Sequence, residues 1–214
     1  FLLGLGLGSY FFGKWSERTD NPLRIYMYVE IGIAAASLVS YVIIEHLPVY
    51  SYLYESAYNN LDLYGLSVVR LLLSVVVLLP PVFLIGGTMP LIAKYFLTVP
   101  ATLGAGFSRI YYLNTLGAFF GALLTGFVLV QYLGVLATLM VAICGNLLVA
   151  GIIALGKSES VPRPEPVAQG APYSYMLAIL FATGFISLSY AVLWVRILST
   201  YGLSTSQAFS LIVA

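Results

Sequence analysis

The chain has 214 residues, of which 61% are hydrophobic and only 8% are charged, with a formal net charge of +1. Soluble domains carry about a quarter charged residues, so this composition excludes that class and predicts an integral membrane protein with the lipid bilayer as partner. A single histidine and a single cysteine argue against a metal site, so small a net charge argues against a nucleic-acid partner, and we expect no cofactor.

Apolar runs of roughly the length that a bilayer requires alternate with short polar turns along the chain. Runs at 25–47, 66–92, 109–131, 135–155 and 173–201 predict complete spans, with partial ones at 1–15 and from 204 onward. The tyrosine-rich stretch 48–65 predicts a loop, and 132–134 predicts a short turn. The expected fold is an all-α polytopic membrane protein with five complete and two partial transmembrane helices, a fragment of a longer protein.

A proline-rich stretch at 156–172 (GKSESVPRPEPVAQGAP) is poor in apolar residues, so it predicts a linker between two helical bundles. We expect a first bundle at 1–155 and the start of a second at 173–214. Lys and Arg concentrate in cytoplasmic loops. The side of the membrane that holds the linker has Lys14, Arg18, Arg24, Lys94, Arg109, Lys157 and Arg163, against Arg70 and Arg196 on the other side. The linker is therefore predicted to be cytoplasmic.

The span at 66–92 contains residues that oppose a regular helix. Proline removes amide donors and glycine adds backbone freedom, and a membrane tolerates an irregular backbone only where protein or water surrounds it. We therefore predict a helix break at Pro81, Gly86, Gly87 and Pro90. The next span opens with a polar end that includes Asn114 and Thr115, which either bind a solute or bond across to the chain around the two glycines.

Glu30 lies about a turn and a half inside its predicted helix, where burial of a carboxylate costs a few kcal/mol unless it is paired. One hypothesis makes it a proton-coupling or cation-binding group. Its candidate partners are then Thr88, Arg109 and Asn114. The alternative is an interfacial structural pair with Arg18 or Arg24.

Four motifs together resemble one known family. They are FLLGLGLGS at 1–9, GGTMPL at 86–91, YLNTLGA at 112–118, and GF at 184–185 followed by YAVLWVR at 190–196. The chain resembles the fused major-facilitator/spermidine-synthase-like membrane proteins, in which a multispanning domain precedes a soluble aminopropyltransferase-like domain. The segment GKWSER, with Gly13, Glu17 and Arg18, is similar to the major-facilitator loop motif that braces the cytoplasmic gate.

The resemblance implies a major-facilitator-like helical bundle in a bacterial or archaeal cell membrane. It implies a membrane module that translocates or presents a small polar or cationic solute, such as a polyamine, with the fused soluble domain and further helices as partners. The alternative is a non-transporting anchor or regulatory domain of a polyamine aminopropyltransferase (spermidine synthase). In either case this chain holds no catalytic residue, and any enzymatic activity would belong to the soluble domain.

Overall fold

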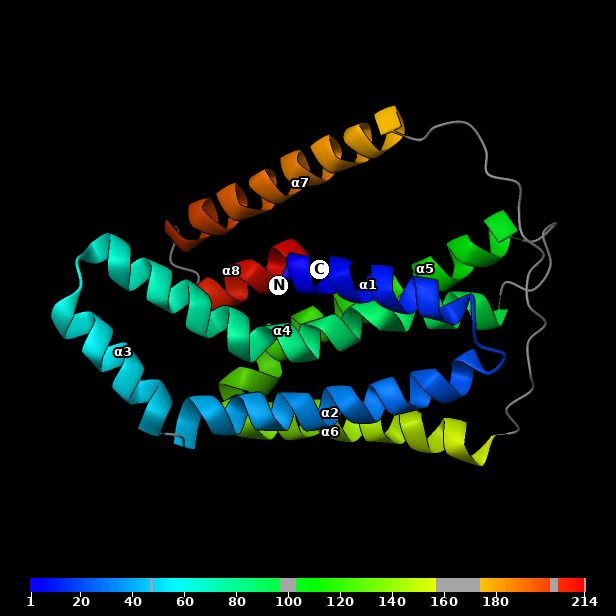
Figure 1. The fold of residues 1–214 in the computed structure, drawn as a ribbon, viewed down its shortest axis with the longest axis horizontal. Helices are drawn as coiled ribbons and strands as arrows, with labels where there is room; N and C mark the ends of the chain where they lie inside the picture. The colour runs from blue at the N-terminus through cyan, green and yellow to red at the C-terminus, as the bar shows by residue number, and fades with distance from the viewer. Residues whose placement is uncertain (47, 97–102, 157–173, 201–203, 214) are drawn as a thin grey trace. The chain divides into compact units, whose positions relative to one another are not determined.

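The computed structural model describes residues 1–46, 48–96, 103–156, 174–200 and 204–213, and every regular element in these ranges is a helix. The elements in chain order (Figure 1) are α1 (Leu2–Ser16), α2 (Pro22–His46), α3 (Pro48–Asn60), α4 (Leu63–Phe96), α5 (Leu103–Leu124), the π-helical turn η2 (Thr125–Leu129), α6 (Val130–Leu155), α7 (Ser174–Thr200) and α8 (Thr205–Val213). The predicted all-helical fold is confirmed. The predicted linker lies, apart from Gly156, outside the described residues.

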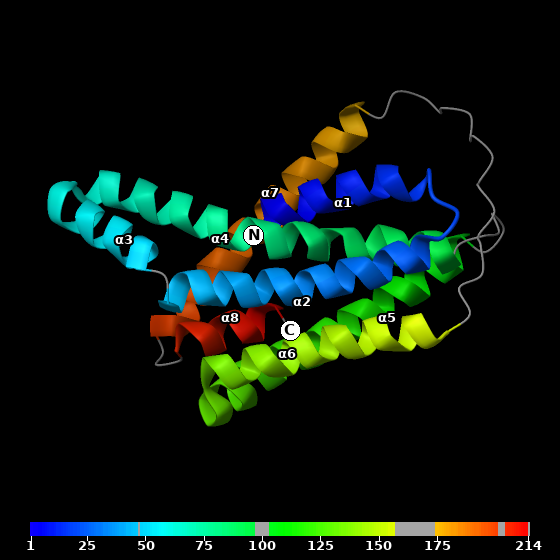
Figure 2. The same cartoon turned by 60° about the horizontal axis from the view of Figure 1, so that its bottom comes forward.

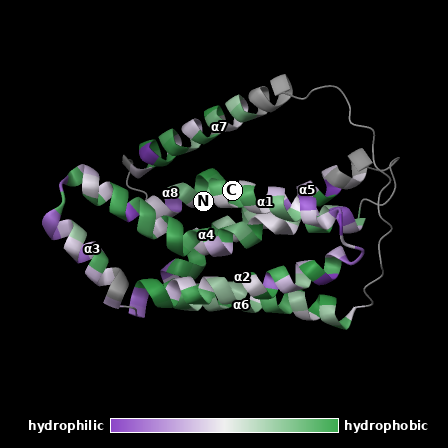
Figure 3. Cartoon of the chain, viewed as in Figure 1, coloured by the Kyte–Doolittle hydropathy of each residue, from purple (hydrophilic) through white to green (hydrophobic). Residues whose placement is uncertain are grey.

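Four helical stretches are long and apolar enough to cross a membrane: Pro22–His46, Leu63–Phe96, Ser108–Leu155 and Phe181–Ser199. Figure 3 shows hydrophobic residues along α2, α4 and α6, and hydrophilic residues in the turn between α1 and α2. The third stretch has 48 residues, about twice what a bilayer needs. It is interrupted at Gly134, whose φ of 78° and ψ of 175° are not helical, and this residue is the last of the short turn predicted at 132–134.

The loop predicted at 48–65 is wrong, because residues Pro48–Asn60 form the helix α3. Proline is favourable in the first turn of a helix, and no further proline or glycine interrupts the segment. Ala57 is buried and Tyr54 half-buried, while Glu55 and Asn59 are exposed. The segment is therefore an amphipathic helix whose apolar side packs against α4.

The chain divides into two compact units, and the first contains α1 to α4. In this unit α1 and α2 both pack against α4, which lies between them in Figure 2. The three helices meet in a small core made of Phe12, Val29, Ile33 and Leu91. In this unit α2 runs antiparallel to α4, and α1 runs parallel to it.

The contact between α1 and α4 is made by glycines. A Cβ added to Gly8 would overlap the backbone carbonyl of Phe83, and one added to Gly86 would lie 2.9 Å from the carbonyl carbon of Leu5. A Cβ on Gly87 would likewise overlap the ring of Phe12. Small residues allow such close approach of membrane helices, and short Cα–H···O contacts accompany it.

The helix break predicted at Pro81, Gly86, Gly87 and Pro90 does not occur, because α4 is continuous from Leu63 to Phe96. The two glycines serve close packing rather than unwinding. Pro81 has no amide hydrogen, so it cannot donate to the carbonyl of Val77 as a normal helical residue would. The hydroxyl of Ser40 on α2 donates to that carbonyl instead, over 2.7 Å. A neighbouring helix thus replaces a bond that proline removes.

The second unit contains residues 108–138 and the described residues from 174 onward. Here α8 packs against α7 and against the π-helical turn. Gly126 in that turn is buried, and a Cβ on it would lie 2.5 Å from Cβ of Ser210. The π-turn therefore places a glycine where α8 approaches closely.

Candidate functional site

Glu30 is the one carboxylate that the described part of the chain buries, with 6% of its surface exposed. It belongs to a stripe on α2 at helical spacing, in which Val29, Ile33 and Ala34 are also buried. The hydroxyl of Tyr26, four residues earlier, donates a hydrogen bond to the Glu30 carboxylate. Residues four apart are neighbours on a helix face, so α2 itself supplies this partner.

The main packing partner of α2, the helix that carries Glu30, is α4. A Cβ on Gly32 would lie 3.1 Å from Leu84, and Ser40 bonds to the carbonyl of Val77, so the two helices run antiparallel. Glu30 comes two residues before Gly32, which in an antiparallel pair corresponds to two residues after Leu84. Glu30 therefore lies at the level of the α4 turn that starts at Gly86. The carboxylate is buried at that level of the first unit.

Thr88 lies in that turn of α4 and is half-buried. Its hydroxyl donates to the carbonyl of Ile85 over 2.8 Å, which leaves the oxygen lone pairs free to accept a bond from a protonated group. The structure thus places Glu30 and Thr88 at about the same level of the antiparallel helices α2 and α4. A direct bond between them stays a prediction.

The other candidate partners, Arg109, Asn114 and Thr115, are exposed residues of α5 and belong to the second unit. Their partnership with Glu30 stays a prediction. The alternative prediction pairs Glu30 with Arg18 or Arg24 at the membrane interface, and both arginines are exposed. Neither forms an ion pair with Glu30 within the described ranges, where Tyr26 is the partner seen.

The residues of the predicted gate motif lie at the end of α1. Glu17 caps the helix and is exposed, as is Arg18, whose amide donates to the carbonyl of Trp15 over 3.0 Å. Gly13 lies beside α4, since a Cβ on it would be 3.9 Å from Cβ of Pro90. The motif therefore lies at the C-terminus of α1, beside the C-terminal part of α4.

Two residues of α2 and α4 escaped the sequence reasoning. Tyr26 could have been found, because its spacing of four from Glu30 is a helical contact. Lys94 in the last turn of α4 gave no signal beyond a contribution to loop charge. Its side-chain nitrogen is buried and has no hydrogen-bond partner in the part of the chain that the structure describes.

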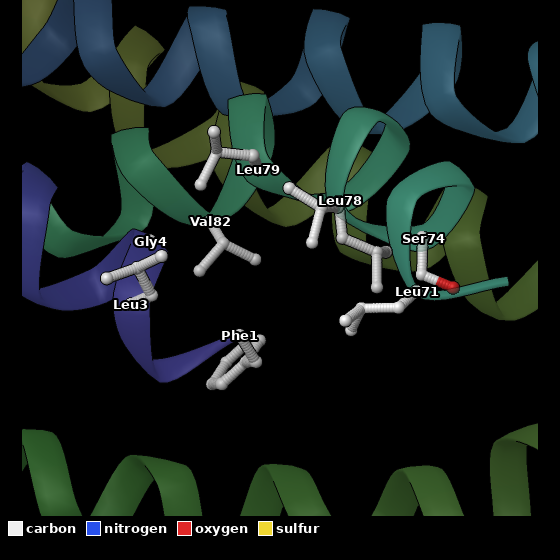
Figure 4. Close-up of a pocket in the computed structure, with 9 residues that line it drawn as sticks. Phe1, Leu3, Gly4, Leu71, Ser74, Leu78, Leu79 and Val82 are labelled. Atoms are coloured by element: carbon white, nitrogen blue, oxygen red, sulfur yellow. The ribbon is translucent and has the colours of Figure 1, made fainter. Parts of the chain in front are cut away.

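A groove elsewhere in the first unit (Figure 4) is almost wholly apolar. It lies where the start of α1 meets the middle of α4, and its lining includes Phe1, Leu71 and Val82 with Ser74 as the one hydroxyl. Gly4 and Val82 place it on the side of α4 that faces α1. Glu30 is carried by α2, which does not line the groove, so the groove is not part of its site.

No protein-family model matches the chain, and neither a curated protein nor a solved structure is significantly similar to it.

Proposed function

We propose that the chain is a membrane module that moves, or presents to an attached domain, a small polar or cationic solute such as a polyamine. The observation that supports this most is the buried carboxylate of Glu30, which has only a tyrosine hydroxyl as described partner. An ionised carboxylate inside a membrane is expensive, so such residues usually mark an ion or proton path. A solute ammonium group or a proton would neutralise it.

Together α2 and α4 have the chemistry that a cation requires. Glu30 supplies charge, the oxygen of Tyr26 supplies a second ligand, and Thr88 at the same level supplies a third oxygen. Oxygen ligands of this kind bind both ammonium groups and hydrated protons. The major-facilitator-like arrangement and the spermidine-synthase-like family rest on the four motifs quoted above and are part of the proposal.

Flux of labelled putrescine and spermidine into vesicles that contain the purified protein tests this function. Replacing Glu30 with Gln keeps the shape of the side chain and removes its charge, and we expect flux to fall about tenfold or more, equivalent to about 1.4 kcal/mol. Glu45→Gln is the matched control, because Glu45 is an exposed carboxylate at the far end of the same helix. It should transport as the native protein does.

Two results contradict the proposal. If flux is present and Glu30→Gln leaves it unchanged, then Glu30 does not bind the moving cation. If the native protein moves neither amine, the chain is better described as the non-transporting anchor of an attached enzyme. In that case Glu30→Gln should also leave aminopropyl transfer by the attached domain unchanged.

A further inference from the structure

A cation on α4 is held by a tyrosine of α3. The Nη2 atom of Arg70 donates to the hydroxyl of Tyr54 over 2.7 Å, and the guanidinium carbon lies 5.3 Å from the centre of the Tyr54 ring. A guanidinium has five N–H donors in one plane, and the hydroxyl oxygen occupies one of them. Arg70 is exposed, and Tyr54 is its partner in the described part of the chain. The remaining donors and the positive charge are therefore open to an anion from outside the chain.

The sequence of α4 places Arg70 at one boundary of the membrane. Residues 71–93 include no charged side chain, and at 1.5 Å per residue they extend about 34 Å, slightly more than the hydrocarbon core. Ser40 of α2 donates to the carbonyl of Val77, which follows Arg70 by seven residues. Seven residues after Ser40, the antiparallel α2 has already ended at His46. Both helices thus leave the apolar layer near the level of Arg70, where the lipid headgroups begin.

The helix α3 is suited to lie in this headgroup layer. It has 13 residues, or about 20 Å, which is too short to cross a hydrocarbon core of about 30 Å. It connects the end of α2 to the start of α4 (Figure 1), and Tyr52, Tyr58 and the nearby Tyr64 are exposed. Tyrosine is enriched at membrane interfaces, because its ring is apolar and its hydroxyl is polar. These three residues form a tyrosine-rich surface at the same end of the unit as Arg70.

The charges at this end of the unit select among lipids. Glu45 near the end of α2 and Glu55 on α3 are exposed carboxylates, while Asp62 accepts the amide of Gly65 over 2.9 Å. These acids outnumber the single permanent cation of the region, Arg70. A headgroup with both a phosphate and an amine complements such a mixture, whereas the carboxylates would repel a headgroup of net negative charge. The charges therefore favour a zwitterionic phospholipid.

We propose that Arg70 and the tyrosine-rich surface bind a zwitterionic phospholipid, such as phosphatidylethanolamine, through its phosphate group. The guanidinium donates to two phosphate oxygens, since its planar fork suits bidentate contact with this group. Tyr54 is a positioning residue, because its hydroxyl and its ring hold the guanidinium. Glu30 lies sixteen residues before His46 on α2, or about 24 Å, so the lipid site is separate from the proposed solute site.

Unfolding midpoints of the purified protein in maltoside micelles test the site. Added phosphatidylethanolamine should raise the midpoint by several degrees and reach saturation, because a ligand of the folded state stabilises it. Diacylglycerol with the same acyl chains and inorganic phosphate should not raise it, and phosphatidylglycerol should act more weakly. Arg70→Gln should raise the lipid concentration for a half-maximal shift about tenfold or more, through loss of charge-assisted hydrogen bonds. Arg24→Gln is the matched control, since Arg24 is an exposed arginine at the other end of α2, and should respond as the native protein does.

Two conservative variants test how the guanidinium is held. Tyr54→Phe keeps the ring and removes the hydroxyl, so it should weaken the lipid response several-fold. Arg70→Lys keeps the charge and loses the planar fork, so its response should lie between those of the native protein and Arg70→Gln. Each variant is compared with its own midpoint without lipid, so a change in stability alone does not alter the result.

Three outcomes would overturn the lipid site. A shift that Arg70→Gln leaves unchanged would show that the guanidinium does not bind the headgroup. An equal shift with diacylglycerol would assign the effect to the acyl chains, and an equal shift with inorganic phosphate would assign it to a free anion. A stronger response to phosphatidylglycerol would reject the preference for a zwitterionic headgroup.

Discussion

Replacing Ser40 with alanine should lower the free energy of unfolding by about 1–2 kcal/mol, because it leaves a membrane-buried carbonyl without a donor. The carbonyl is that of Val77, which receives the Ser40 hydroxyl over 2.7 Å. Its usual helical donor would be the amide of residue 81, and Pro81 has none. The alanine variant therefore removes the donor that replaces the missing helical bond.

Making Ser40→Ala in the Pro81→Ala variant separates the loss of the hydrogen bond to Val77 from the loss of side-chain packing. In Pro81→Ala the amide of residue 81 can donate to the Val77 carbonyl, so Ser40→Ala should then cost less than about 0.5 kcal/mol. The four proteins form a double-mutant cycle with a coupling of about 1 kcal/mol. Equilibrium unfolding by added SDS in mixed micelles, followed by circular dichroism, gives each value.

Ser67→Ala is the control for the chemical change itself. The Ser67 hydroxyl bonds to the carbonyl of Leu63 over 2.7 Å within the same helix, and that carbonyl keeps its helical amide donor. Its replacement should therefore change stability by less than about 0.5 kcal/mol. If Ser40→Ala costs the same in the native and Pro81→Ala backgrounds, compensation of the proline by Ser40 is refuted.

Three further changes test the packing of the helices. Gly8→Ala should lower the free energy of unfolding by about 1–3 kcal/mol, because its methyl group would overlap the backbone of α4. Gly6→Ala has open space around it and should be neutral or stabilising. Unfolding by SDS compares the two variants. Gly134→Ala should cost about 1–3 kcal/mol, because its backbone conformation is nearly exclusive to glycine, and Gly145→Ala serves as its helical control. Tyr54→Phe removes the 2.7 Å bond from Arg70 and should increase hydrogen exchange in α3 with little change in global stability.

The helical fold could be predicted because long apolar runs in this chain have one regular outcome in lipid. The helix at 48–60 was missed because its many tyrosines and polar residues give little apolar signal. Its stability comes from packing against α4 and from the bond of Arg70 to Tyr54, contacts that no local pattern reveals. The break expected at Pro81 does not form for a similar reason, since the compensating hydroxyl of Ser40 lies 37 residues before Val77 in sequence.

Part of the candidate site was also predictable. A lone carboxylate inside an apolar run indicates a special residue, and Glu30 is indeed buried. Which residues surround it depends on the antiparallel register of α2 and α4. That register is set by contacts such as Gly32 with Leu84, which the sequence does not encode locally. For this reason the burial of the Lys94 side-chain nitrogen could not be predicted.

The glycine contacts between α1 and α4 divide the first unit into a rigid part and an adjustable part. At Gly8 and Gly86 two backbones touch, so a shift of one residue would drive a side chain into a main chain. α1 and α4 therefore form one rigid pair. By contrast, α2 is held to α4 by side chains and by the Ser40 hydroxyl, which tolerate small adjustments. The buried carboxylate of Glu30 thus lies on the helix that is held to α4 by side chains rather than by contact between backbones.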